Sequence, residues 1–115
     1  MKHKILVVTS NTDHRFLLTV LLTEYGFIVD APEDLSLCRK LFEENEYHKV
    51  VLDYDYKSKN NRLFCSYLDS HHELHKSVLI QANTDDDDLA CKVFEQGGRF
   101  LNKPYETEEL MYAMQ

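Results

Sequence analysis

The chain has 115 residues, of which 43% are hydrophobic and 29% are charged, and its formal net charge is -7. This length fits one domain with a buried core, and no apolar stretch approaches the roughly 20 residues that a transmembrane helix needs. The negative charge would repel a phosphate backbone, so the domain by itself is not expected to bind nucleic acid. The composition predicts a single globular domain without a membrane span.

The N-terminal stretch MKHKILVV has basic residues before an apolar run that is too short for the core of a signal peptide. We interpret this run as a first strand, in a cytoplasmic protein. The three cysteines, Cys38, Cys65 and Cys91, cannot all pair and have no C-x-x-C spacing. They are expected to be reduced residues of helices.

Five short runs rich in Val, Ile, Leu or Phe have the length and composition of strands. In chain order they are Ile5 to Val8, Phe27 to Ala31, Val50 to Asp53, Val78 to Gln81 and Arg99 to Asn102. Between these runs the apolar residues follow the spacing of helices. The chain is therefore predicted to alternate between strand and helix.

The first helix is predicted from about Thr12 to Tyr25, because Gly26 can close it. Its apolar stripe is expected to be Phe16, Leu17, Val20 and Leu21. The later stripes are Leu35, Cys38, Leu41 and Phe42, then Leu63, Phe64, Tyr67 and Leu68, then Leu89, Ala90, Val93 and Phe94. A fifth helix is expected from Glu106 to Met114.

The acidic run Asp85 to Asp88 precedes the fourth stripe and lacks the spacing of a calcium-binding loop. Acidic side chains stabilise the N-terminus of a helix through the helix dipole. We expect this run to be the charged start of the fourth helix.

Uninterrupted apolar strands joined by helical crossovers indicate a parallel sheet that is covered on both faces. The expected fold is α/β, a (βα)5 flavodoxin-like open sheet of five parallel strands in the order 2-1-3-4-5. Ligands bind such sheets at the carboxyl ends of the strands, near the switch in strand order. Residues that directly follow strands are expected there, namely Thr9, Ser10, Gln81 and Lys103 beside Asp53, which ends the third strand.

The opening KILVV, the VVLD that ends at Asp53 and the FLNKPY that carries Lys103 and Pro104 resemble the receiver domain of bacterial response regulators. The resemblance covers the whole chain. It implies that Asp53 accepts a phosphoryl group from a histidine kinase and that Lys103 pairs with this acid. It also implies that the short helix from Glu106 leads toward a C-terminal effector domain, which in this family most often binds DNA.

The sequence departs from the family where a metal ion would bind. The family has two acids directly after the first strand, and this chain has Thr9 and Ser10 there. Mg²⁺ prefers carboxylate ligands and gives up its water reluctantly, so a hydroxyl is a poor replacement. Mg²⁺ is therefore expected to bind weakly or not at all, and Asp53, Asp55 and Asp13 are the remaining weak candidates for ligands.

A second departure concerns the conformational switch of the family. The family has Ser or Thr after the fourth strand, which couples the phosphoryl group to an aromatic residue on the fifth. This chain has Gln81 in the first place and Phe100 in the second. The loop DYDYKSKNNR after the third strand also lacks proline and glycine. The resemblance therefore implies a switch that lacks one of its parts.

Three functions remain open. The first is a non-enzymatic signalling module that acts through protein contacts, with Asp53 and Lys103 in a direct salt bridge. The second is a working phosphoacceptor receiver in which Asp55 or Asp13 replaces the lost ligands. The third is a mononucleotide-binding protein, because TSNTD after the first strand offers hydroxyl and backbone N–H groups to a phosphate.

For the first function, the family resemblance points to a surface made by the fourth helix, the fifth strand and the fifth helix. Phe100 is predicted on an edge strand of this surface, with Tyr105 after the Lys103-Pro104 turn. An apolar stripe on the fifth helix is expected to extend the surface, through Leu110, Met111 and Met114. The expected partner is a second copy of the domain or another protein.

Overall fold

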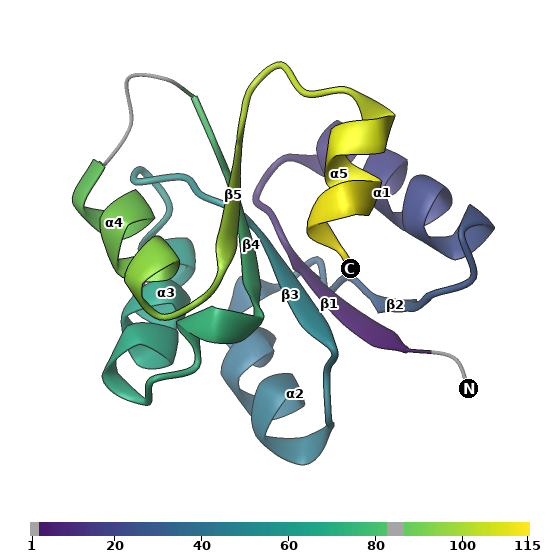
Figure 1. The fold of residues 1–115 in the computed structure, drawn as a ribbon. Helices are drawn as coiled ribbons and strands as arrows, with labels where there is room; N and C mark the ends of the chain where they lie inside the picture. Colours follow the sequence, from purple (N-terminus) through teal and green to yellow (C-terminus); the bar gives the residue numbers. More distant parts are fainter. Residues whose placement is uncertain (1–2, 83–86) are drawn as a thin grey trace.

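The computed structural model describes residues 3–82 and 87–115, and within them five parallel strands form one sheet in the order β2-β1-β3-β4-β5 (Figure 1). The strands are β1 (Lys4–Val8), β2 (Ile28–Asp30), β3 (Lys49–Asp53), β4 (Ser77–Gln81) and β5 (Arg99–Asn102). The predicted fold class and strand order are confirmed, and each predicted strand boundary is correct to within one residue.

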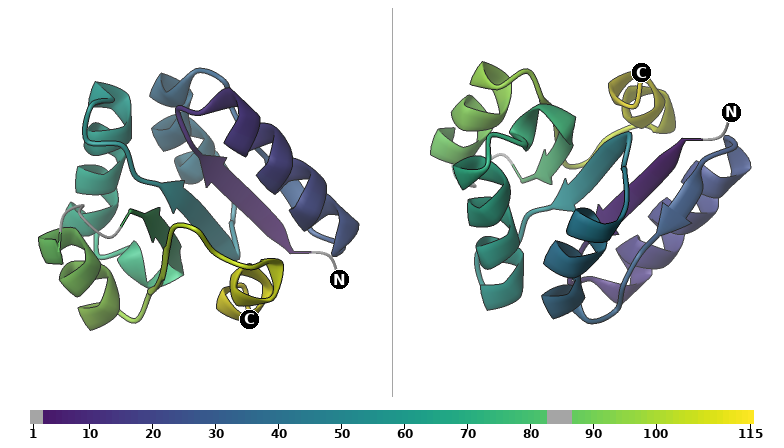
Figure 2. Two further views of the ribbon diagram at one scale, coloured as in Figure 1. Left: turned by 90° about the horizontal axis from the view of Figure 1, so that it is seen from above. Right: turned by 90° about the horizontal axis from the view of Figure 1, so that it is seen from below.

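Helices cover both faces of the sheet (Figures 1 and 2). One face carries α1 (Thr12–Glu24) and α5 (Thr107–Ala113), and the other carries α2 (Cys38–Glu44), α3 (Lys59–Ser70) and α4 (Asp87–Glu95). Two short 3-10 turns, Leu35–Leu37 and Leu74–Lys76, precede α2 and β4. Alternate residues of each strand enter opposite cores, so Ile5 packs with α1 and α5 while Leu6 packs with α2 and α3.

Helix α1 starts and ends at residues suited to those places. The Asn11 side chain accepts a 2.9 Å hydrogen bond from the backbone N–H of His14, which is a helix N-cap. Gly26, just past the other end, has a φ of +94°, which glycine adopts without the strain that a side chain would bring. The Asn11 cap places His14 in the first turn, beside the carboxyl ends of the strands.

The predicted apolar stripe of α1 is wrong except at Leu21, which packs against the core. Leu18 and Leu22 are the buried residues of this helix, whereas Phe16 is 72% exposed and Leu17 and Val20 are also exposed. The apolar residues of α1 are distributed around more than one face, so their spacing did not identify the face that packs on the sheet. The same limitation places Leu63 of α3 and Phe94 of α4 at the surface, although both were assigned to stripes.

The apolar stripe expected to extend outward from α5 is also wrong. Leu110 and Met114 are buried in the core beneath α5, and Met111 packs against that core. The exposed aromatic residue of this helix is instead Tyr112, which is 64% exposed.

The remaining structural expectations concern the cysteines, the acidic run and the membrane. Cys38, Cys65 and Cys91 are free and lie in α2, α3 and α4, as predicted. Within the acidic run, Asp85 and Asp86 lie outside the described residues, and α4 begins at Asp87. Among the described residues, no helix combines the length and apolar character needed to cross a membrane.

Candidate functional site

The predicted site residues meet at the carboxyl ends of the strands. Asp53 ends β3, which pairs with β1 and β4, and Thr9 directly follows β1. Both residues are buried, with Thr9 fully so. The backbone N–H of Lys103 donates a 2.9 Å hydrogen bond to the carbonyl of Gln81, which extends the β4–β5 pairing past the strand end. The sheet thus brings Lys103 over the same edge as Asp53.

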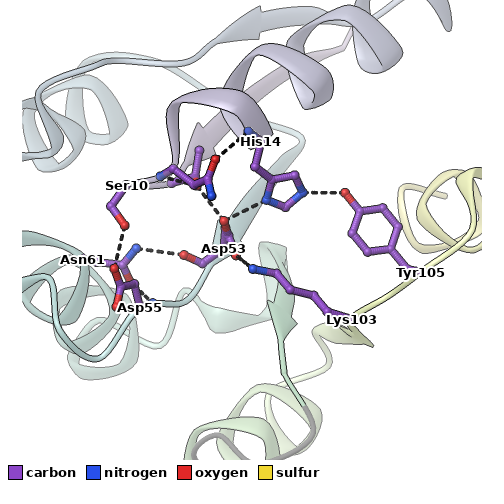
Figure 3. A network of polar contacts seen from close by, with 9 residues as sticks. Ser10, His14, Asp53, Asp55, Asn61, Lys103 and Tyr105 are labelled. Atoms are coloured by element: carbon purple, nitrogen blue, oxygen red, sulfur yellow. Dashed lines mark hydrogen bonds and ion pairs between the residues drawn. The ribbon is translucent and has the colours of Figure 1, made fainter.

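The carboxylate of Asp53 is surrounded by donors (Figure 3). The Thr9 hydroxyl donates to Oδ2 at 2.6 Å, and His14 Nδ1 lies 2.8 Å from the same oxygen. Lys103 Nζ lies 2.6 Å from Oδ1. Oδ1 has no well-directed hydrogen bond among the described residues, so its contact with Lys103 is an ion pair. The predicted Asp53–Lys103 salt bridge is therefore present.

These contacts keep Asp53 ionised. Burial raises the pKa of its carboxyl group, but the contacts with His14 and Lys103 act in the opposite direction. The Thr9 hydroxyl adds to their effect, and together they hold the pKa of Asp53 below its ordinary value. The carboxylate is a buried anion compensated by protein groups.

His14 was not identified from the sequence as a site residue. It projects from the first turn of α1 between Asp53 and Tyr105, and its Nε2 lies 2.6 Å from the Tyr105 hydroxyl (Figure 3). The sequence does contain a signal, because Asn11 is a good N-cap and the third residue after a cap lies in the first helical turn. Tyr105 was assigned to the α4–β5–α5 surface, but its hydroxyl is directed at His14 instead.

Asn61, which also was not predicted, is fully buried at the start of α3. Its side-chain amide donates to the backbone carbonyl of Asp53 at 2.9 Å and accepts from the backbone N–H of Asp55 at 3.3 Å. These two bonds fix the chain as it leaves β3 (Figure 3). The asparagine therefore orders a loop that contains neither proline nor glycine.

The residues around Asp53 do not fit a magnesium ion. Both oxygens of Asp55 are engaged, Oδ2 by the Ser10 hydroxyl at 2.7 Å and Oδ1 by the backbone N–H of Lys57 at 2.9 Å. Asp13 is exposed in the first turn of α1. Among the described residues, no three His, Cys, Asp or Glu side chains are grouped as metal ligands. Mg²⁺ needs several well-placed oxygen ligands, and this donor set does not provide them.

Gln81 and Phe100, which the resemblance assigned to a conformational switch, lie at different register positions of β4 and β5. Gln81 is buried, and its Oε1 has no hydrogen-bond partner among the described residues. Phe100 lies on edge strand β5 with 42% of its surface exposed. Its neighbour in the β4 register is Leu79, not Gln81.

An aromatic groove of about 700 Å³ lies between the end of α4, strand β5 and helix α5. Its exposed aromatic residues are Phe94, Phe100 and Tyr112, of which Phe94 is 71% exposed. The Arg99 guanidinium carbon lies 5.1 Å from the centre of the Tyr112 ring, a cation–π contact. We call this surface the α4–β5–α5 face.

Comparison with known proteins finds similarity in structure but not in sequence. No protein-family model matches the sequence, and neither does the sequence of any curated protein. The chemotaxis protein CheY4 of Vibrio cholerae superimposes with a TM-score of 0.80 at 15% identity, covering 100% of this chain and 98% of that chain. The receiver domain of the Francisella response regulator 1452 gives a TM-score of 0.80 at 17% identity, with coverages of 98% and 93%.

The chain has the fold of a response-regulator receiver domain. The same fold is found within a longer protein, NtrX from Brucella abortus, with a TM-score of 0.77 at 21% identity. The match covers 97% of this chain but 25% of the NtrX chain. The receiver fold can thus be one part of a larger protein.

Proposed function

We propose that this domain is an atypical receiver of two-component or phosphorelay signalling that acts through protein contacts, without the usual magnesium-dependent phosphorylation. The observation that supports this most is the full use of the Asp53 carboxylate by Thr9, His14 and Lys103. Lys103 supplies a positive charge at Oδ1, and Thr9 and His14 supply hydrogen bonds at Oδ2. The site is balanced without an ion.

Phosphorylation of Asp53 would have to disturb this arrangement. One carboxylate oxygen must attack phosphorus, and Oδ2 is already held by two donors while Oδ1 is held by a cation. The incoming phosphoryl oxygens also need charge neutralisation, which Mg²⁺ supplies in phosphoryl transfer. The residues around Asp53 favour an ionised carboxylate that is not phosphorylated.

The output is proposed to use the α4–β5–α5 face, through a second copy of the domain or another protein. Phe94, Phe100 and Tyr112 form an exposed aromatic surface beside Arg99, and aromatic residues and arginine are enriched at protein interfaces. No charge change at Asp53 is needed to expose them. A C-terminal effector domain would place the chain in a longer regulator, as the coverage of NtrX illustrates.

Association should therefore be measured in Mg²⁺ for the unmodified domain, for the domain treated with acetyl phosphate and for Asp53→Ala. Sedimentation or light scattering over a concentration series is expected to show the same association for all three. Phe100→Ser should weaken it, whereas Phe16→Ser is the matched control because Phe16 is more exposed but lies on α1. Association that requires acetyl phosphate and is lost in Asp53→Ala would contradict the proposal.

A working phosphoacceptor is the second candidate, in which a histidine kinase modifies Asp53. It is favoured by the 2.6 Å contact with Lys103 and by the lowered pKa of Asp53, since a nucleophilic carboxylate must be ionised. Intact-mass measurement after acetyl phosphate treatment, with Asp53→Asn as the control, tests this function directly. A modified fraction that is absent from the control would establish it.

A further inference from the structure

The His14 ring bridges two groups that do not otherwise share a hydrogen bond. Its Nδ1 lies 2.8 Å from Asp53 Oδ2, and its Nε2 lies 2.6 Å from the Tyr105 hydroxyl. The His14 side chain is 13% exposed, so the protein holds the ring in place. The two contacts leave the ring on opposite sides, one toward β3 and one toward the β5–α5 connection (Figure 3).

The chemistry of the ring makes these two contacts depend on each other. An ionised carboxylate only accepts hydrogen bonds, so Asp53 requires a proton on His14 Nδ1. In the neutral ring Nε2 then carries a lone pair, and the Tyr105 hydroxyl must donate to it. In the charged ring Nε2 carries a proton and the phenol oxygen must accept it. In either state the carboxylate and the ring together determine the direction of the Tyr105 hydrogen bond.

Tyr105 is placed where such a change would alter the surface. It follows the Lys103-Pro104 turn and lines a groove of about 580 Å³ between α1 and the β5–α5 connection. Leu17, Leu21 and Thr107 line the same groove. A change in the position of the Tyr105 ring would therefore change the shape of this groove.

Within residues 3–82 and 87–115, the structure shows no comparable route through Gln81. Its Oε1 is buried without a partner among the described residues, and Phe100 faces outward from the edge of the sheet. The hydrogen bonds that leave Asp53 toward the β5–α5 connection pass through His14.

We propose that His14 couples Asp53 to Tyr105, so that the charge of Asp53 sets the orientation of Tyr105 and the shape of the groove between α1 and the β5–α5 connection. His14 is then a positioning residue that acts between the acid and the tyrosine. The proposal holds whatever changes the charge of Asp53, and it does not depend on association through the α4–β5–α5 face.

Two other routes could link Asp53 to Tyr105, and the test must separate them. Burial raises the pKa of the Tyr105 phenol, and the charge of Asp53, acting through space, raises it further. The ion pair with Lys103 also leads along the backbone to Tyr105. Both routes remain when His14 is replaced, whereas the hydrogen-bonded route does not.

The test is a mutant cycle read by NMR in protein labelled at the tyrosine ring carbons, because the carbon that bears the hydroxyl reports its hydrogen bonding. Asp53→Asn is compared with its parent in the wild-type background and in His14→Leu. The Tyr105 shift caused by Asp53→Asn is expected to fall at least about threefold when His14 is absent, which is the non-additivity of directly coupled residues. An equal shift in both backgrounds would overturn the proposal.

Asp55→Asn is the matched control, since Asp55 is two residues from Asp53 but is bound to Ser10 and Lys57 instead of His14. It should leave the Tyr105 resonance unchanged in both backgrounds, and a shift as large as that of Asp53→Asn would also overturn the proposal. Far-ultraviolet circular dichroism checks that each variant is folded. If His14→Leu does not fold, His14→Phe replaces it, because its ring has a similar shape but no nitrogen that could bond to Asp53 or Tyr105.

Discussion

Replacing Asp53 with alanine is expected to destabilise the domain, even though it removes a buried charge. Where several acids share a site, removing one relieves repulsion between like charges. The neighbours of Asp53 are instead the Thr9 hydroxyl, the His14 ring and the Lys103 ammonium group, none of which carries a negative charge. The sign of the change in stability therefore reports whether the site is balanced by the protein, as the contacts indicate.

The contacts set the size of the effect. The fully buried Thr9 hydroxyl loses its acceptor, and a buried unsatisfied polar group costs about 1–3 kcal/mol. His14 loses a partner as well, with little access to water, which adds a further cost of about 1–3 kcal/mol. The Lys103 side chain is 41% exposed and can turn to solvent, so losing its ion pair with Asp53 adds only about 0–1 kcal/mol. Since the cost of burying the carboxylate is also removed, we expect a net loss of about 2–4 kcal/mol.

Urea denaturation at pH 7 measures this difference, with Asp55→Ala as the control. Asp55 accepts exposed hydrogen bonds from Ser10 and from the backbone of Lys57, and water can replace both, so its removal should cost only about 1 kcal/mol. If Asp53→Ala is as stable as the wild type, or no less stable than the control, then Thr9, His14 and Lys103 do not stabilise the carboxylate of Asp53 as argued.

The same comparison has an expected pH dependence. The pKa of Asp53 is lower in the folded protein than its ordinary value, which the unfolded chain retains. The stabilisation from ionised Asp53 is therefore fully present above the unfolded pKa of about 3.9 and is lost as the pH falls toward the folded pKa. The difference between wild type and Asp53→Ala should shrink in that acidic range, and a difference that stays constant would argue against a charged resting state.

Three further results are expected. Mg²⁺ should bind in the millimolar range or more weakly in an NMR titration. A dissociation constant below about 100 μM, a binding free energy of about 5.5 kcal/mol or more, would contradict the conclusion that the residues around Asp53 do not fit this ion. Tyr105 should ionise only at about pH 12 in an alkaline titration followed by NMR of its ring carbons, because burial and the charge of Asp53 raise its pKa to about 12. Ionisation near the ordinary value of about 10 would contradict the buried position of its hydroxyl. Gly98→Ala should lower the free energy of unfolding in urea by about 1–3 kcal/mol, because a methyl there would collide with the Leu74 carbonyl and lie 2.7 Å from Val93 Cγ1. An unchanged unfolding midpoint would mean that the backbone around Gly98 moves to accommodate the methyl group.

The sequence was sufficient to predict the sheet and most of the core-facing residues of α2, α3 and α4, but not the face of α1. Buried parallel strands read as short uninterrupted apolar runs, so their ends and order followed from length and composition. Helix α1 has apolar residues on several sides, and the choice between Leu18 and Leu17 as a core residue depends on how the helix rotates against the sheet. That rotation is set by tertiary packing, which periodicity alone does not contain.

The site was predicted to the extent that it depends on strand ends. Thr9, Asp53 and Lys103 follow or end strands, and parallel strands carry such residues to one edge. His14 and Asn61 belong to the first turns of helices, and their contact with Asp53 depends on where each helix begins. The capping side chains Asn11 and Ser58 fix those starts. A histidine three residues after a predicted cap is thus a position to inspect in similar sequences.

The absence of acids after β1 and the presence of His14 are two parts of one electrostatic solution. A buried carboxylate needs an opposite charge and partners for its remaining lone pairs. With further acids beside it, the site would carry excess negative charge that only an added cation could neutralise. With Thr9 and Ser10 in those places, Lys103 forms an ion pair with one oxygen of Asp53, and the hydroxyl of Thr9 and the ring of His14 contact the other. Restoring an acid at position 9 would place a second anion beside Asp53 and replace a donor by an acceptor. His14 Nδ1 could then donate to either of two carboxylates, and its hydrogen bond to Tyr105 would no longer depend on Asp53 alone.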